Sequence, residues 1–225
     1  MILGLDMSSK KSGYSLFDSK KLIDYGVWEM SFEKESDWRE RILFMATQLS
    51  EYIDSHTITQ IYVEDVPPII ENTQTVKVLS ALQGCVLTIC RLHNIQIEFI
   101  PNNRWKNLIG IDITHSKANK TKQKELKLID KASLPKLKKN VKGYEKKMSV
   151  DYANKIFDTD LIWKSYSSKF NQDDIADAIN LVASQIYNTP LKYDIDTFEN
   201  IINNLYSEIK DKNNNASFGK KARCK

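Results

Sequence analysis

Five acidic side chains stand where the sequence predicts that a strand ends or a helix begins. Asp6 and Glu64 each follow directly on a short apolar run. Asp173, Asp174 and Asp177 open a predicted helix, where spacings of three and four residues place two carboxylates on one face. Carboxylates on a shared face repel one another unless a cation lies between them, and hard divalent ions prefer such oxygen ligands.

This pattern favours metal-dependent chemistry on a phosphodiester. Two ions about 3.5–4 Å apart can bind the attacking water and the leaving oxygen. We therefore expect Asp6, Glu64, Asp174 and Asp177 to be catalytic and to bind two Mg²⁺ ions, with Mn²⁺ as an alternative metal and Asp173 as an alternative ligand. Each acid alone also fits an ordinary role, such as a turn residue, a surface charge or a helix N-cap. Their occurrence together, in this element order, favours the metal site.

The distribution of charge indicates a polyanionic partner. The chain has 225 residues and a net charge of +4. Residues 104–147 contain 14 Lys/Arg against 4 Asp/Glu, whereas residues 1–103 contain 9 against 14 and residues 148–225 contain 10 against 11. Such a basic segment is either a solvated surface or a surface for nucleic-acid phosphates. We expect DNA contacts from Lys10, Lys11, Arg104, Lys106, Lys117, Lys120, Lys122 and Lys124.

Composition argues against several classes of protein. The 41% hydrophobic residues suffice for a core, but no apolar run reaches the ~18 residues of a membrane span. The N-terminus lacks a cationic leader and a cleavage site. Three cysteines without paired or metal-like spacing indicate a reducing compartment. We therefore expect a cytoplasmic protein without a membrane partner, in the host cytoplasm if the source is viral.

Hydrophobic periodicity predicts an α/β fold. Apolar runs separated by turn residues predict an antiparallel three-stranded meander, followed by two further strands that suit parallel pairing. The predicted strands cover residues 1–6, 13–17, 22–30, 60–63 and 95–100, and the predicted helices cover 37–53, 73–92, 173–187 and 197–209. The helix over 73–92 is apolar on more than one face, which is typical of a buried helix or of one that is half core and half subunit interface. Together these elements predict a mixed five-stranded sheet with helices on both faces.

Several motifs resemble those of RuvC-type Holliday junction resolvases, which belong to the ribonuclease H-like superfamily. Residues 2–14 (ILGLDMSSKKSGY) resemble the first motif, residues 61–64 (IYVE) the second acidic strand, and residues 174–178 (DIADA) the final acidic helix. Residues 76–84 resemble the helix after the second acid, and residues 101–110 resemble the stretch that carries the family lysines. The small single chain looks most like a phage or other viral member.

The resemblance implies a ribonuclease H-like fold and a metal-dependent endonuclease that nicks branched DNA, such as four-way junctions, forks and flaps. It also implies a homodimer, because two symmetric nicks suit a two-fold assembly. The dimer interface is expected on the helix over 73–92, through Leu79, Leu82 and Val86. The alternatives are a ribonuclease H-type nuclease for RNA–DNA hybrids and a non-catalytic junction-binding protein.

The same interpretation divides the chain into three parts. Residues 1–190 are expected to form the nuclease domain, with a basic insertion at about 111–168 that shows only weak helical signals. Residues 191–210 are expected to form a helical extension, and residues 211–225 a flexible tail. An actin-like ATPase would need a second copy of the first motif, and 225 residues are too few for that.

Overall fold

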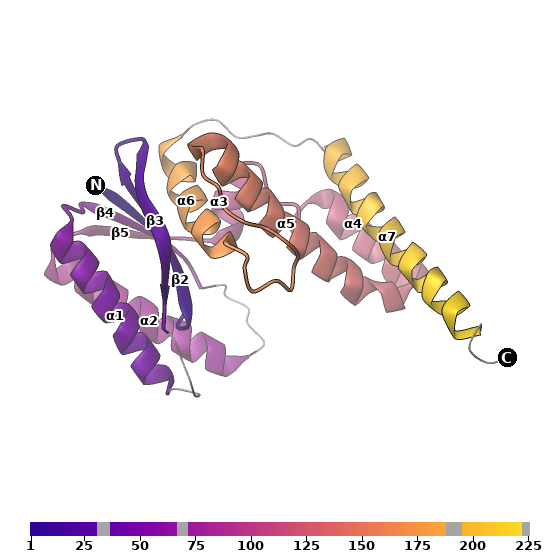
Figure 1. Ribbon diagram of the computed structural model, residues 1–225, viewed down its shortest axis with the longest axis horizontal. Helices are drawn as coiled ribbons and strands as arrows, with labels where there is room; N and C mark the ends of the chain where they lie inside the picture. The colour runs from indigo at the N-terminus through magenta and orange to yellow at the C-terminus, as the bar shows by residue number, and fades with distance from the viewer. Residues whose placement is uncertain (31–36, 67–71, 188–194, 222–225) are drawn as a thin grey trace.

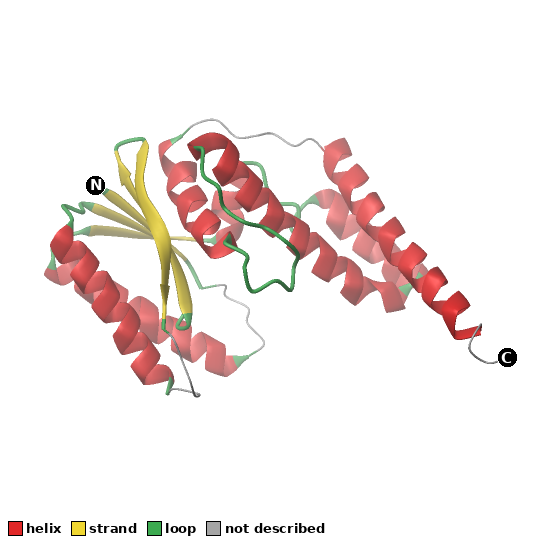
Figure 2. Ribbon diagram, viewed as in Figure 1, coloured by secondary structure: helices red, strands yellow, loops and turns green. Residues whose placement is uncertain are grey.

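A mixed five-stranded sheet forms the centre of the protein (Figures 1 and 2). The computed structural model describes residues 1–30, 37–66, 72–187 and 195–221. The strand order is β3-β2-β1-β4-β5, in which β1–β3 form an antiparallel meander and β4 and β5 run parallel to β1. The strands are β1 (Ile2–Asp6), β2 (Lys11–Asp18), β3 (Lys21–Glu29), β4 (Gln60–Glu64) and β5 (Gln96–Ile100). The predicted fold class is confirmed.

Two helices cover one face of the sheet, α1 (Trp38–Ser55) and α2 (Thr73–Leu92) (Figure 1). The side chain of Asp37 accepts a hydrogen bond from the backbone nitrogen of Arg39 and so caps α1, as its position in the sequence predicts. The apolar stripe of α1 packs with α2 against the sheet in a single core cluster.

The predicted dimer interface on α2 is wrong in two of its three residues. Leu82 and Val86 are each 1% exposed and belong to the core between α2, α1 and the sheet, while Leu79 is half-buried. The side chains of Leu82 and Val86 are therefore buried by contacts within their own chain and are not exposed to a second subunit. Among the described helices, only α2 is long and apolar enough to cross a membrane by length and composition, and one stripe of it packs into the core.

The opposite face of the sheet is covered by α6 (Asp173–Ile186), with α3 (Asn102–Leu108) beside it. Two glycines let α6 approach the strands closely. A Cβ atom at Gly13 would overlap the backbone carbonyl of Asp174, and one at Gly4 would overlap that of Ala178. Ser15 donates a hydrogen bond to the same Ala178 carbonyl at 2.8 Å. Larger residues at the glycines would push the acidic start of α6 away from β1.

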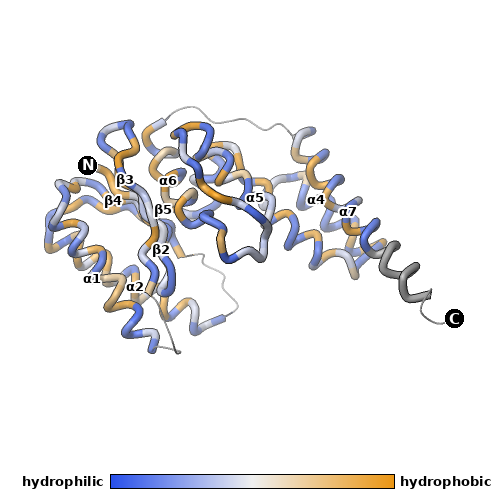
Figure 3. Tube along the Cα trace, in the orientation of Figure 1, coloured by the Kyte–Doolittle hydropathy of each residue, from blue (hydrophilic) through white to orange (hydrophobic). Residues whose placement is uncertain are grey.

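The basic segment and the C-terminus form a second, helical layer that projects from the sheet (Figure 1). It contains α4 (Lys117–Ile129), a 3-10 turn (Lys131–Ser133), α5 (Leu134–Phe157) and α7 (Ile195–Lys221). Figure 3 shows apolar positions alternating with polar ones along these helices. Their apolar side chains join one core cluster, which includes Leu126, Leu137, Val141, Ile202 and Tyr206.

This layer corrects two expectations. The basic segment, for which only weak helical signals were expected, is mostly helical, because its sparse apolar residues meet those of α7. The last helix continues to Lys221, so the tail expected from residue 211 begins as helix; residues 222–225 lie outside the described part of the chain. The C-terminal helix is thus a packing partner of the basic segment.

Candidate active site

The acids at the ends of β1 and β4 are brought together by the parallel pairing of these strands. Leu5 lies opposite Val63 in the register, so Asp6 and Glu64 follow at the same edge of the sheet. Burial raises the pKa of Asp6 well above its usual range, and the negative charges of Glu64, Asp177 and Asp174 raise it further. Glu64, Asp174 and Asp177 therefore lie close enough to Asp6 for their charges to affect its pKa.

Helix α3 fixes the orientation of Glu64. Asn102 donates a hydrogen bond from Nδ2 to Glu64 Oε1 at 2.8 Å, and Trp105 donates one from Nε1 to Oε2 at 3.0 Å. Trp105 is fully buried, so its indole is a rigid donor as well as part of the core. Both carboxylate oxygens of Glu64 are held in place before any ligand binds.

A buried lysine lies among the acids. Lys106 is 6% exposed, and its ammonium group donates a hydrogen bond to Glu145 Oε1 at 3.0 Å. Burial alone would lower the pKa of Lys106, but Asp177, Glu145 and Glu64 outweigh this effect and raise it, so the ammonium remains charged. Lys106 was expected to contact DNA, which stays a prediction; the structure places it among the acids, where it also lines the larger cavity described below.

Asp177 is buried beside this lysine. Burial raises its pKa to about 7; Lys106 opposes the shift and Glu64 adds to it. Ser149 donates a hydrogen bond to Asp177 Oδ1. The carboxylate is therefore near the balance between its neutral and charged forms at neutral pH, which is typical of functional sites.

The two neighbouring acids of α6 point to different partners. Asp174 forms an ion pair with Lys11 at 3.2 Å and contributes to the field at Asp6. Burial and the charge of Asp173 raise the pKa of Asp174, against the effect of Lys11. Asp173 is buried and pairs with Lys146 of α5. Asp174 is thus the better placed of the two to act with Asp6.

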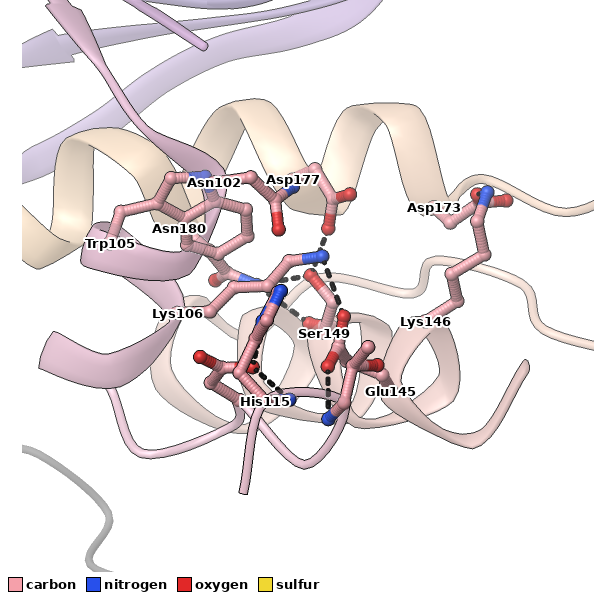
Figure 4. A network of polar contacts seen from close by, with 12 residues as sticks. Asn102, Trp105, Lys106, His115, Glu145, Lys146, Ser149, Asp173, Asp177 and Asn180 are labelled. Carbon is pink, nitrogen blue, oxygen red and sulfur yellow. Dashed lines mark hydrogen bonds and ion pairs between the residues drawn. The ribbon is translucent and has the colours of Figure 1, made fainter. Parts of the chain in front are cut away.

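Helix α5 contributes side chains that the sequence analysis did not single out (Figure 4). Glu145, Lys146 and Ser149 contact Lys106, Asp173 and Asp177, respectively. The one signal in the sequence is the four-residue spacing of Glu145 and Ser149, which places them on one helix face. That spacing is common, and nothing local showed that this face meets the acids.

Two cavities meet at Glu64. The larger has a volume of about 770 Å³ and is lined by residues that include Asn102, Lys106, His115 and Lys142. The smaller, of about 60 Å³, lies between Asp6 and Glu64 on the side of α2. The larger cavity is big enough for part of a nucleotide strand and carries amide and cationic donors beside the acids.

The donor set suits a hard divalent cation. All four acids supply carboxylate oxygens, the ligands that Mg²⁺ prefers, and the Asp6 carboxylate accepts no hydrogen bond from any residue that the structure describes. Within the same residues, no three acidic, histidine or cysteine side chains already converge on one metal position. The carboxylate chemistry and the absence of a hydrogen-bond donor to Asp6 among the described residues fit a cation, whereas the side-chain geometry is not that of a closed, preformed ligand cage.

The remaining predicted DNA-binding residues are placed in two ways. Lys10, Lys117, Lys120 and Lys124 are exposed. Lys11 pairs with Asp174, Arg104 lies 3.7 Å from Glu98, and Lys122 pairs with Glu125 at 3.1 Å. Lys10 and the exposed lysines of α4 are therefore available to a phosphate backbone.

Comparison with known proteins identifies the fold. No family model matches the sequence, and no curated protein matches it. Among solved structures, the chain is similar to RuvC of Thermus thermophilus in complex with a Holliday junction substrate (TM-score 0.52, 10% identity, covering 81% of this chain and 90% of that one). It is also similar to a second structure of Thermus thermophilus RuvC (TM-score 0.51, 14% identity, covering 84% and 99%). The chain therefore has a RuvC-like fold.

Proposed function

We propose that the protein is an endonuclease that nicks branched DNA, such as four-way junctions, at a carboxylate-bound pair of Mg²⁺ ions. The observation that carries the proposal is that Glu64, Asp174 and Asp177, from β4 and α6, lie close enough to Asp6 of β1 to raise its pKa, and that Glu64 also lines the larger cavity. Similarity to a RuvC bound to a Holliday junction supports branched DNA as the substrate class. A viral source and a cytoplasmic location stay predictions.

Different residues of the chain would hold the metal ions, orient a metal ligand and bind the phosphate. Bound divalent ions would supply an activated water and charge stabilisation for the leaving oxygen; Asp6, Glu64, Asp174 and Asp177 would hold them. Glu64 is presented by Asn102 and Trp105. Lys106 lines the larger cavity and adds a permanent positive charge beside the position for a phosphate.

We further infer a homodimer, because a four-way junction has two-fold symmetry and a two-fold dimer presents two active sites to it. Leu82 and Val86 are core residues, so the contact would use other positions, and the side of α2 away from the core exposes Leu87 and Gly84. Sedimentation of the purified protein measures the state directly, and a monomer that cleaves both strands symmetrically would refute this inference.

One assay tests the function. The protein is incubated with a labelled four-way junction, a linear duplex of the same sequence and an RNA–DNA hybrid, each with Mg²⁺, Mn²⁺ or EDTA. We expect cleavage of the junction with either metal and none with EDTA. Cleavage of the hybrid alone would favour a ribonuclease H-type enzyme, and binding without cleavage would favour a junction-binding protein; either result would overturn the proposal.

A further inference from the structure

Helix α5 places two buried polar side chains against the acidic cluster. Glu145 and Ser149 are 5% and 0% exposed and lie four residues apart, on one face of the helix. Neighbouring positions on the buried side of α5, such as Val141 and Tyr152, are apolar. Burying a charged or polar group among such residues costs free energy unless the group is paired. The hydrogen-bond partners of Glu145 and Ser149 therefore indicate the roles of these two side chains.

We propose that Glu145 and Ser149 are positioning residues of the active site. Glu145 holds the ammonium group of Lys106 in place, and Ser149 holds the carboxylate of Asp177. The proposal rests on the nuclease function proposed above and deepens it, because it makes the inserted helix a part of the catalytic unit.

Both oxygens of Glu145 are engaged. Oε1 accepts from Lys106 Nζ at 3.0 Å, and Oε2 accepts from the backbone nitrogen of Thr114 at 2.9 Å. The carboxylate cannot rotate without breaking one of these bonds, so it anchors the same ammonium group that feels the charges of Asp177 and Glu64. Without Glu145, the anionic partners left to the ammonium among the described residues would be carboxylates of the site, Asp177 and Glu64, and it would compete with a metal ion for them.

Ser149 is itself locked by a neighbour on α6. Asn180 donates from Nδ2 to Ser149 Oγ and to the backbone oxygen of Ser149, each at 2.8 Å. Because Oγ already accepts from Asn180, its own hydrogen is free to be directed at Asp177 Oδ1, to which it donates. Figure 4 shows Lys106, Glu145 and Ser149 together below Asp177. Asp177 Oδ2 has no hydrogen-bond donor among the described residues, which leaves that oxygen for a cation.

The test compares Glu145→Gln and Ser149→Ala with matched controls on the exposed surface, Glu125→Gln and Ser207→Ala. Four quantities are measured: the single-turnover rate of junction cleavage at saturating protein with Mg²⁺, junction affinity with Ca²⁺, Mn²⁺ binding by calorimetry without DNA, and the melting temperature. Residues that orient metal-site ligands typically contribute about 10- to 100-fold in activity or metal affinity. We expect a loss of that size in rate for both test variants, with junction affinity essentially unchanged and both controls near wild type.

A double-mutant cycle separates positioning from a general structural role. If Glu145 acts through Lys106, Glu145→Gln will cause no further loss of rate in a Lys106→Gln background. An equal loss in both backgrounds, or a folded Glu145→Gln with the wild-type rate, would overturn the proposal. Should Glu145→Gln fail to fold, Glu145→Asp keeps the charge but shortens its reach, and a wild-type rate in that variant would be equally fatal.

Mn²⁺ binding keeps the two proposals distinguishable. We expect Ser149→Ala to weaken Mn²⁺ binding about tenfold and Ser207→Ala to leave it unchanged. If wild type binds Mn²⁺ but cuts no junction, the proposed function is refuted while weakened binding by Ser149→Ala upholds the positioning role. If Ser149→Ala binds Mn²⁺ as wild type does, Ser149 is not a positioning residue, whatever the substrate.

Discussion

Replacing Asp177 by asparagine should stabilise the metal-free protein at pH 8. The pKa of Asp177 rises from an ordinary 3.8 to about 7, mainly because the side chain is buried. At 1.36 kcal/mol per pH unit, this corresponds to roughly 4 kcal/mol of unfavourable free energy for the charged form. Part of the shift depends on the charge of Glu64, and a proton on either carboxylate relieves it. We therefore expect a gain of about 2 kcal/mol, or a melting temperature higher by about 4–8 °C.

The gain should depend on pH in a defined direction. The folded protein keeps the proton of Asp177 up to about pH 7, whereas the unfolded chain releases it near pH 3.8. The stability of wild type therefore falls as the pH rises through this window. The asparagine side chain of the variant does not titrate, so the two proteins should differ most at pH 8 and little at pH 3.5.

Thermal melting in EDTA at pH 3.5, 6 and 8 measures this difference, with Asp151→Asn as a control because Asp151 is an exposed residue of α5. Adding Mg²⁺ at pH 8 should raise the melting temperature of wild type more than that of Asp177→Asn, because a ligand stabilises the state that binds it. A variant that melts below wild type at pH 8 in EDTA would refute the reasoning, as would a gain of equal size at pH 3.5.

Three further predictions follow from the same structure. Asp6→Asn and Glu64→Gln should each abolish junction cleavage while junction affinity in Ca²⁺ stays within about threefold, and substantial cleavage by either would remove that residue from the site. Changing Lys120 and Lys124 together to alanine should flatten the slope of log affinity against log salt by up to about two phosphate contacts, and an unchanged slope would make α4 a solvated surface. Leu82→Ala should lower the free energy of unfolding by about 2–5 kcal/mol. A variant with wild-type stability but a different sedimentation coefficient would instead indicate that Leu82 lies in a dimer interface.

The acids at the strand ends could be predicted from the sequence because their signal is local. Asp6 and Glu64 follow short apolar runs, and such runs predict strands whatever the rest of the chain does. Parallel pairing then brings their ends to one edge of the sheet. Asp174 and Asp177 lie on a helix with a strong apolar face, which predicts that the helix packs on the sheet; their place beside Asp6 was expected from the resemblance of residues 174–178 to the final acidic helix of the RuvC-type resolvases.

The basic segment could not be predicted in the same way. Its helix α5 buries Glu145 and Ser149 along with its apolar side chains, which weakens the hydrophobic period that identifies a helix. The hydrogen-bond partners that make this burial possible are distant in the chain. Lys106 is 39 residues from Glu145, and Asp177 is 28 residues from Ser149. A contact over such a distance leaves no pattern in one sequence.

The error on α2 has a related cause. A helix that is apolar on several sides does not show which side meets its own core and which side meets a partner. In the structure, α1 and the sheet bury the stripe that contains Leu82 and Val86, while Leu87, one residue further along, is 51% exposed. Only the packing of α1 selects between these stripes, and the sequence of α2 does not contain that information.

The sheet side of the site and the helical layer carry different parts of its charge. The sheet and α6 supply the acids, and the burial of these acids, together with their mutual repulsion, disfavours the folded state, as the raised pKa values of Asp6 and Asp177 indicate. One compensating group, Lys11 on Asp174, comes from β2 of the sheet. The others come from outside the sheet: Lys106 of α3, held by Glu145 of α5, and Lys146 of α5, which pairs with Asp173. The helical layer therefore does more than add a basic surface for DNA. It offsets part of the electrostatic cost of an acidic site that the sheet by itself would have to bear.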